Sequence, residues 1–185
     1  MRKAFLLLLT CISITAFGQH TGYIQAGKLK VYYEAEGKGS PLLMLHACYL
    51  NLHLWDKQAA YFSKRLRVIR FDMPGCGKTT GADTVILIQD IVRTLLDSLH
   101  IRKGSFIGES IGASSLVDFA LAYPERIDKL VLASPGLSGW HDVLELDSVS
   151  KQLFLHIDSV ALIHNKPLIA ETFTHLWFDG PTRTA

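Results

Sequence analysis

Short apolar runs alternate with amphipathic stretches between residues 42 and 133, and this order constrains the fold most strongly. The apolar runs are Leu42–Leu45, Val68–Phe71, Ser105–Ile107 and Leu130–Ala133. Runs of this length are typical of strands buried on both faces. The stretches with apolar residues at helical spacing are 55–65, 86–99 and 111–123. The alternation predicts an α/β fold in which a mostly parallel sheet is flanked by helices.

The segments on either side of this region have different patterns. Residues 22–36 alternate in places, and Gly27-Lys28 lies between the two halves, which predicts a hairpin at a sheet edge. After His141 the strand-like runs stop, and 143–165 and 168–178 predict two or three amphipathic helices separated by Pro167. We therefore expect a core at 19–140 and a partial helical lid at 141–185.

The N-terminus has the features of a secretory signal peptide. Arg2 and Lys3 precede an apolar run at 4–17, and the small residues Ala16 and Gly18 follow a signal-cleavage pattern. A membrane anchor is the alternative, but the run is short for a span and contains hydroxyl residues. Cleavage of 1–18 predicts an exported protein, periplasmic or secreted, with no stable membrane association.

Charge and cysteine content narrow the classes of partner and cofactor. Removing Arg2 and Lys3 from the 19 basic residues leaves 17 against 17 acidic residues, so no basic stripe for nucleic acid is expected. Cys48 and Cys76 remain after cleavage, and their spacing does not match a zinc site. We expect a small-molecule substrate and neither a metal nor an organic cofactor.

One pentapeptide predicts the chemistry. Gly108-Glu109-Ser110-Ile111-Gly112 matches G-x-S-x-G, follows a strand-like run and precedes a helical stretch. In that setting a sharp turn exposes the serine hydroxyl above the sheet, and the glycines avoid side-chain clashes. The following helix N-terminus favours developing negative charge. Ser110 is therefore the candidate nucleophile; a serine that only caps the helix is the alternative.

Several ordered motifs resemble the α/β-hydrolase superfamily, in its esterase, lactonase and C–C hydrolase group. The matching segments are Leu45-His46-Ala47-Cys48 with Trp55, for the His-Gly turn after the third strand; Phe71-Asp72-Met73-Pro74-Gly75-Cys76-Gly77, for the Asp-x-Pro-Gly-x-Gly loop after the fourth; Tyr123–Ile127 with Leu130–Leu132, before and in the sixth; and Trp177–Pro181, late in the lid. The resemblance covers about Gly22 to Arg183. It implies an α/β-hydrolase fold and a serine hydrolase activity.

The resemblance also implies an oxyanion hole. Its donors would be the backbone N–H groups of Ile111 and Cys48, although the usual His-Gly is His46-Ala47 here. His46 precedes the serine, which is the wrong order for the family's base, so we expect it to support the oxyanion loop. His53 is expected to be a pocket or surface residue. Relatives that use an aspartate nucleophile, such as epoxide hydrolases, are excluded by Ser110.

The stretch Gly75-Cys76-Gly77-Lys78-Thr79 contains Gly-Lys-Thr but is not a phosphate-binding loop. That pattern needs a glycine five places before Gly77, where this chain has Asp72. Asp72 is expected to be structural. In the fold implied by the resemblance, Cys48 and Cys76 follow neighbouring strands, and either a disulfide or two free buried thiols fits.

A catalytic acid and histidine in family order are missing from the sequence. The histidines after Ser110 are at 141, 156, 164 and 175, all within the expected lid. We therefore expect an incomplete α/β-hydrolase that is nearly inactive as given and whose sixth strand is an uncovered, aggregation-prone edge. Ester turnover abolished by Ser110→Ala would instead assign the base to one of these histidines.

Three functions remain open. The first is hydrolysis of a small ester, lactone or related carbonyl substrate. Aromatic residues of the lid favour an apolar substrate group if they do not simply pack on the core; they are Trp140, Phe154, Phe173, Trp177 and Phe178. The second is a non-catalytic ligand-binding module on the same fold, and the third is a C–C bond hydrolase.

Overall fold

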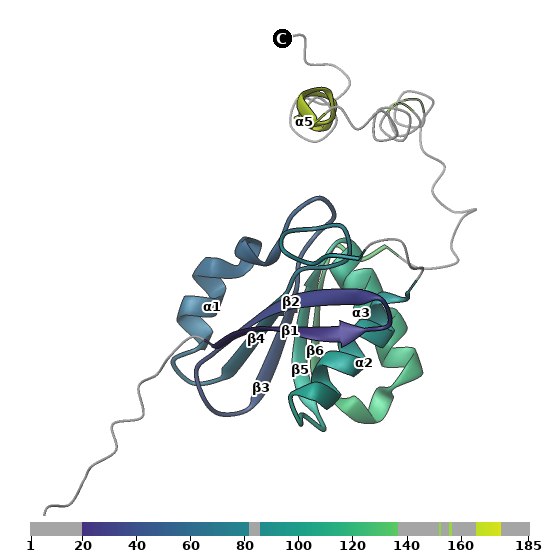
Figure 1. Cartoon of the computed structure of the whole chain (residues 1–185). Coiled ribbons are helices and arrows are strands. Elements are labelled where there is room, and N and C mark those ends of the chain that lie inside the picture. The colour runs from purple at the N-terminus through teal and green to yellow at the C-terminus, as the bar shows by residue number, and fades with distance from the viewer. Residues whose placement is uncertain (1–19, 82–85, 137–151, 153–155, 157–165, 175–185) are drawn as a thin grey trace, which may run out of the picture. The chain divides into compact units, whose positions relative to one another are not determined.

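The computed structural model describes residues 20–81, 86–136, 152, 156 and 166–174. The chain divides into two units, 1–138 and 139–185 (Figure 1). The expected signal peptide at 1–18 lies outside the described residues, as does most of the expected lid. Within the described part of the chain, no helix combines the length and apolar character needed to cross a membrane.

The first unit is built on one mixed sheet. Its strands are β1 (His20–Ala26), β2 (Leu29–Glu36), β3 (Pro41–Leu45), β4 (Arg67–Phe71), β5 (Gly104–Glu109) and β6 (Ile127–Ala133). They lie in the order β1-β2-β4-β3-β5-β6. The pairs β4–β3, β3–β5 and β5–β6 are parallel, and β1–β2 and β2–β4 are antiparallel. The predicted α/β class and mostly parallel sheet are confirmed.

The predicted edge hairpin is confirmed as well. β1 pairs with β2 from His20↔Ala35 to Ala26↔Leu29, which leaves Gly27-Lys28 as the turn. Gly27 has a φ of 59°, a value that glycine adopts without the steric cost of a Cβ atom.

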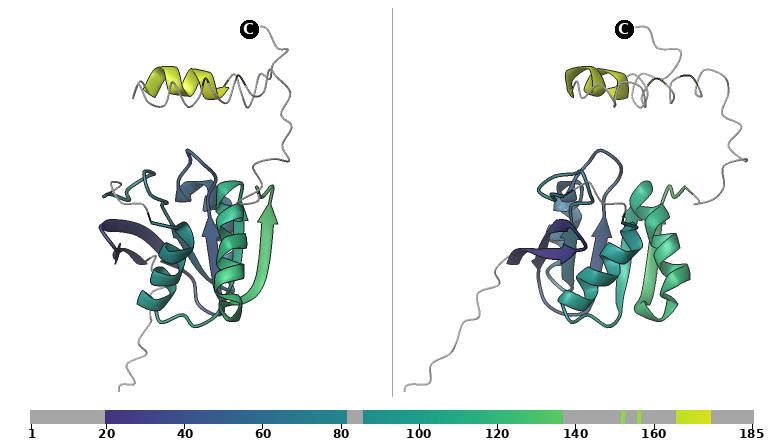
Figure 2. Two further views of the ribbon diagram at one scale, coloured as in Figure 1. Left: turned by 90° about the vertical axis from the view of Figure 1, so that its right-hand side faces the viewer. Right: turned by 45° about the vertical axis from the view of Figure 1, so that its right-hand side comes forward.

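Helices cover both faces of the sheet. α1 (Asp56–Phe62) follows the short 3₁₀ helix η1 (Leu52–Trp55) and lies on one face, and α2 (Ile88–Ser98) and α3 (Ile111–Ala122) lie on the other (Figures 1 and 2). A second 3₁₀ helix, η2 (Pro124–Arg126), leads into β6. The connection from β3 to β4 runs one way across the sheet, and those from β4 to β5 and from β5 to β6 run the other way. Right-handed connections in opposite directions place their helices on opposite faces.

The predicted helical periodicity corresponds to burial. In α2 the buried residues are Ile91, Val92, Leu95 and Leu96, and they pack in a cluster with β1, β5 and α3 side chains. A smaller cluster with Trp55 and Ala59 lies on the α1 face. The first expected helix, 55–65, is shorter than predicted. Asn51 starts an earlier 3₁₀ turn by accepting a hydrogen bond from the His53 N–H at 3.0 Å, and α1 ends at Phe62.

β6 forms an edge of the described sheet. Leu130 and Leu132 pack against the main cluster, while Val131 is 53% exposed. An exposed apolar side chain on an open strand edge is the setting in which intermolecular strand pairing occurs.

In the second unit the structure describes the helix α5 (Lys166–Thr174) and two isolated helical residues, Gln152 and His156. Pro167 was expected between helices but lies in the first turn of α5. Proline is tolerated there because the N–H groups of the first turn have no intrahelical partner. The expectation that this region forms a lid stays a prediction.

Candidate active site

Ser110 occupies a strained turn between β5 and α3. Its φ and ψ are 51° and −119°, a combination that residues with a Cβ atom rarely adopt. Such strain, on the order of 1–3 kcal/mol, persists only where the surrounding structure enforces it. The residue is exposed. The structure therefore presents the Ser110 side chain to solvent at the end of a buried strand.

The two glycines of the pentapeptide are required by close packing. A Cβ atom on Gly108 would lie 2.6 Å from the Ala113 nitrogen. A Cβ atom on Gly112 would lie 2.6 Å from the carbonyl oxygen of His46 and 2.7 Å from that of Leu45. Because all three distances are shorter than real Cβ contacts, the turn needs glycine at position 108, before Ser110, and at position 112, after it. Gly112 also places the first turn of α3 directly against the end of β3.

Hydrogen bonds hold the other side of the turn against β6. The Ser110 N–H donates to the Ala133 carbonyl at 2.9 Å. The Ser114 hydroxyl donates to the Ser110 carbonyl at 3.1 Å and accepts from the Gly136 N–H at 2.9 Å. Ser114 was not predicted from the sequence, although a serine four residues after the candidate nucleophile, on the same helix face, was an available signal.

The loop after β3 begins beside this turn. Leu45 of β3 pairs with Gly108 of β5, so the residues that follow each strand start at the same level of the sheet. A tight turn follows, in which the Leu50 N–H donates to the Ala47 carbonyl at 3.3 Å and Tyr49 has a φ of 61°. Within the described residues, the N–H groups of Cys48 and Ile111 donate no backbone hydrogen bond. This agrees with the expected oxyanion donors, and their role stays a prediction.

His46 is buried and bridges the loops after β3 and β4. Its Nε2 accepts a hydrogen bond from the Met73 N–H at 3.0 Å, so the proton of the neutral ring is on Nδ1, which donates to the Ala47 carbonyl at 2.8 Å. Burial lowers the pKa of His46, against smaller opposing effects of the Ala47 hydrogen bond and Asp72. Both ring nitrogens are occupied, which fits a supporting role and leaves no free nitrogen for proton transfer.

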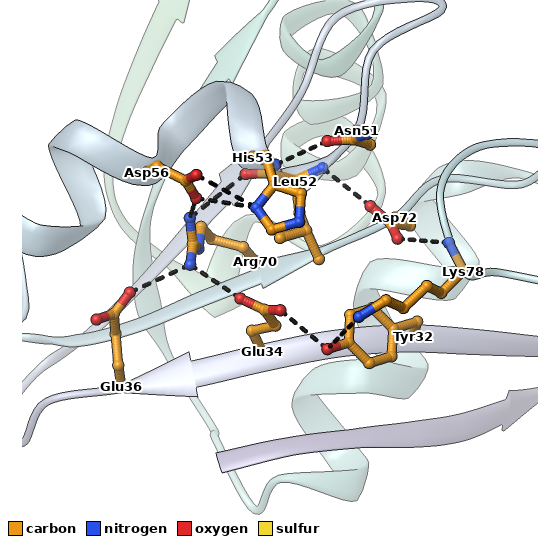
Figure 3. A network of polar contacts seen from close by, with 10 residues as sticks. All are labelled: Tyr32, Glu34, Glu36, Asn51, Leu52, His53, Asp56, Arg70, Asp72 and Lys78. Carbon is orange, nitrogen blue, oxygen red and sulfur yellow. Dashed lines mark hydrogen bonds and ion pairs between the residues drawn. The ribbon is translucent and has the colours of Figure 1, made fainter. Parts of the chain in front are cut away.

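Asp72 links the same two loops from the buried end of β4. One carboxylate oxygen accepts from the Leu52 N–H at 2.9 Å and the other from the Lys78 N–H at 2.8 Å (Figure 3). The Thr79 hydroxyl donates to the Asp72 carbonyl at 2.6 Å. The backbone N–H of Lys78 is thus bonded within the protein, as expected for a structural aspartate rather than a phosphate-binding loop.

A second polar cluster surrounds Arg70 on β4. Its guanidinium contacts Asp56 at 2.6 Å, Glu34 at 3.0 Å and Glu36 at 3.3 Å (Figure 3). His53 is exposed and contacts Asp56 at 3.1 Å, so it is a surface residue. Partial burial raises the pKa of Asp56, but the hydrogen bonds from Arg70 and His53 outweigh it and lower the pKa overall. The sequence pattern gave no sign of this cluster, since its members come from three separate segments.

Large apolar side chains are exposed next to the two available amides. Tyr49 is 58% exposed, Leu50 45% and Ile111 40%. The described segments that follow β3 and β5 contain no Asp, Glu, Lys or Arg until Asp56 and Asp118. Among residues 20–81 and 86–136, no histidine is hydrogen-bonded to the Ser110 side chain.

The mixed sheet and the glycine-flanked serine turn define a class of α/β proteins. A family model described as alpha/beta hydrolase fold matches residues 40–158, and the chain belongs to this family. Membership of the α/β-hydrolase superfamily, which the motifs predicted, is confirmed.

Relatives with known names fall into more than one type of hydrolase. The chain is 33% identical over 135 residues to a 2-hydroxy-6-oxononadienedioate/2-hydroxy-6-oxononatrienedioate hydrolase of Paraburkholderia phymatum, a match over 67% of this chain and 46% of the relative. The naproxen esterase (carboxylesterase NP) of Bacillus subtilis is 25% identical with a TM-score of 0.59, over 65% of this chain and 44% of the esterase.

Cfl2 of Burkholderia cenocepacia shares the fold, with a TM-score of 0.69 and 18% identity over 85% of this chain and 56% of Cfl2. The chain spans about half the length of the curated relatives it matches.

Proposed function

We propose that the protein is a serine hydrolase that cleaves a small ester, lactone or related carbonyl substrate, with Ser110 as its nucleophile. The proposal rests mainly on the strained, solvent-exposed conformation of Ser110 between two glycines that leave no room for a Cβ atom. Strain maintained at an exposed serine has no evident structural benefit. It is typical of a functional position.

In the proposed reaction the Ser110 hydroxyl adds to the substrate carbonyl carbon and its proton passes to a base. The carbonyl oxygen becomes an oxyanion, which the N–H groups of Ile111 and Cys48 stabilise. Losing one such donor typically slows a reaction about 10²–10³-fold. The leaving group departs with a proton, and water then releases the acid from Ser110. His46 maintains the position of the Cys48 loop through its bond to Met73.

The base is proposed to lie beyond residue 136. The histidines there are at 141, 156, 164 and 175; three fall outside the described residues, and His156 belongs to the second unit. A base provided by residues beyond those of this chain is the alternative. We further propose export through residues 1–18 and a lid formed by residues after 140.

The substrate is proposed to have an apolar group next to its carbonyl. Tyr49, Leu50 and Ile111 expose apolar surface beside the two amide donors, and burying that surface on a ligand would yield about 25 cal/mol per Å². The second candidate is C–C bond hydrolysis, which is favoured by the activity named for the Paraburkholderia relative. Both reactions would use the same nucleophile and oxyanion donors.

Acyl transfer to Ser110 can be tested even if the base is absent from the chain. The purified 185-residue protein is incubated with p-nitrophenyl butyrate, with and without imidazole as an external base, and p-nitrophenol release and intact mass are measured. We expect imidazole to accelerate formation of a butyryl adduct that maps to the peptide containing Ser110. Turnover without imidazole would place the base within the chain.

Matched variants make the result specific. Ser110→Ala should eliminate the adduct, and Ser105→Ala, which changes a serine of β5 before the turn, should leave it unchanged. An equal adduct yield in Ser110→Ala would refute the nucleophile assignment. A meta-cleavage type diketone substrate, compared with the ester under the same conditions, then separates C–C from ester hydrolysis.

A further inference from the structure

Cys48 and Cys76 lie in loops that leave the sheet side by side. β3 and β4 are parallel neighbours, from Pro41↔Arg67 to Met44↔Arg70. Cys48 follows β3 by three residues and Cys76 follows β4 by five. Parallel neighbours end at the same edge of a sheet, so both thiols belong to that edge. Both are free thiols; Cys48 is exposed and Cys76 is half-buried.

Two contacts hold these loops together close to the cysteines. The Met73 N–H donates to His46 Nε2 at 3.0 Å, and His46 is two residues before Cys48. The Cys76 N–H donates to the Met73 carbonyl at 3.0 Å, which closes a tight turn. The same buried histidine therefore fixes the turn that contains Cys76 against the strand end that leads to Cys48.

The direction of the Cys76 pKa shift agrees with this placement of the two cysteines. The pKa of the Cys76 thiol is raised, first by burial and then by the charge of Cys48, which has a larger effect than the charge of Asp72. Asp72 is itself a near neighbour, because its carboxylate packs against Gly77. This contribution agrees with the placement of both cysteines at one edge of the sheet, which the pairing of β3 with β4 establishes.

We propose that Cys48 and Cys76 are a redox-active pair that closes to a disulfide at the edge of the active site. The reaction is an exchange with an oxidised disulfide. The thiolate of one cysteine attacks glutathione disulfide, which forms a mixed disulfide and releases one reduced glutathione. The second cysteine then attacks the mixed disulfide and releases the second glutathione. In total, two cysteine thiols and one glutathione disulfide give the Cys48–Cys76 disulfide and two molecules of reduced glutathione.

The bond would act on the site itself. Cys48 donates one of the two proposed oxyanion N–H groups, so a disulfide to Cys76 fixes or displaces that donor according to the redox state. This consequence rests on the proposed function, whereas pairing of the thiols does not depend on Ser110.

Disulfide formation can be measured without any enzyme assay. The full chain with Cys11→Ser retains two thiols; it is fully reduced, freed of reductant and incubated with oxidised glutathione. Trypsin would separate the cysteines into the peptides 39–57 and 71–78. We expect free thiols to fall from two per chain to none, with a mass spectrum dominated by the cross-linked pair of peptides. Unfolding the protein in guanidinium before oxidation should lower the cross-link yield several-fold.

The single variants Cys48→Ser and Cys76→Ser should each leave one thiol, which takes up one glutathione. Two glutathione adducts on the parent protein without a cross-link would overturn the proposal, as would equal cross-link yields in folded and unfolded protein. Ser110→Ala should cross-link as the parent does. The butyryl-adduct test of Ser110 and the cross-linking test of the two cysteines can therefore fail independently.

Discussion

Around Arg70, a buried cation contacts carboxylates from β2 and α1. Ser110, by contrast, is exposed, and among the described residues the nearby N–H groups of Cys48 and Ile111 donate no backbone hydrogen bond. Both terminal nitrogens of Arg70 are bonded, and Glu34 also accepts from the Tyr32 hydroxyl at 2.9 Å. The backbone at Ser110 is strained instead.

The contrast is between a paired, buried polar cluster and the turn that holds the proposed nucleophile. Buried polar groups are tolerated when they are paired with one another, since each unpaired group costs stability. The Arg70 cluster follows that rule almost completely; only its buried Nε has no partner among the described residues. Ser110 is exposed and lies outside this rule, and its unusual feature is the strained backbone, which is typical of a functional position.

Removing the cation should have the largest effect on stability. Arg70→Met keeps the side-chain volume but removes the guanidinium that contacts Glu34, which is 5% exposed. We expect the free energy of unfolding to fall by about 3–5 kcal/mol in denaturant titrations. The double variant Arg70→Met with Glu34→Gln should recover part of the loss. A single variant as stable as the parent would mean that the cluster contributes no structural support.

Adding a methyl group at the serine turn should cause the second-largest loss of stability. Gly112→Ala places a Cβ atom 2.6 Å from the His46 carbonyl oxygen, and we expect a loss of about 2–3 kcal/mol measured in the same way. Gly136→Ala is the control, because among the described residues its Cβ would meet only the Ser114 hydroxyl, at 3.3 Å. Its effect should stay within about 0.5 kcal/mol. Equal losses would argue against close packing at Gly112.

Relaxing the strain should stabilise the fold modestly. Ser110→Gly removes the Cβ atom that conflicts with a φ of 51°, so we expect a gain of about 1 kcal/mol together with complete loss of the butyryl adduct. Ser110→Ala keeps the Cβ atom and should lose the adduct without the gain in stability. A Ser110→Gly protein less stable than the Ser110→Ala protein would contradict stored strain at this residue.

Protonation of His46 should have the smallest effect, and it depends on pH. Burial lowers its pKa from the ordinary value of 6.5, so the unfolded chain binds the proton more readily. Stability from this residue is therefore fully present above pH 6.5 and is lost as the pH falls through the lowered folded pKa. Unfolding measured between about pH 7.5 and about pH 5 should show this loss, and His46→Gln should reduce it. An unchanged pH profile in the variant would show that other groups dominate.

Local patterns in the sequence were sufficient for the elements and for the nucleophile turn. The apolar runs at 42–45 and 105–107 predicted strands, the spacing of Ile91, Val92, Leu95 and Leu96 predicted the buried face of α2, and G-x-S-x-G predicted a turn at Ser110. These signals depend on residues within a few positions of one another, which is the range over which backbone geometry and side-chain periodicity act.

The contacts that tie the site together were decided by tertiary structure. The tautomer of His46 depends on Met73, and the burial of the Arg70 charge depends on Glu34 and Asp56. Cys48 and Cys76 belong to one sheet edge because β3 and β4 are neighbours. Such pairs lie far apart in the sequence. Strand order and loop packing bring them together, and no local pattern encodes that order by itself, because long-range pairing is set by how the whole core is buried.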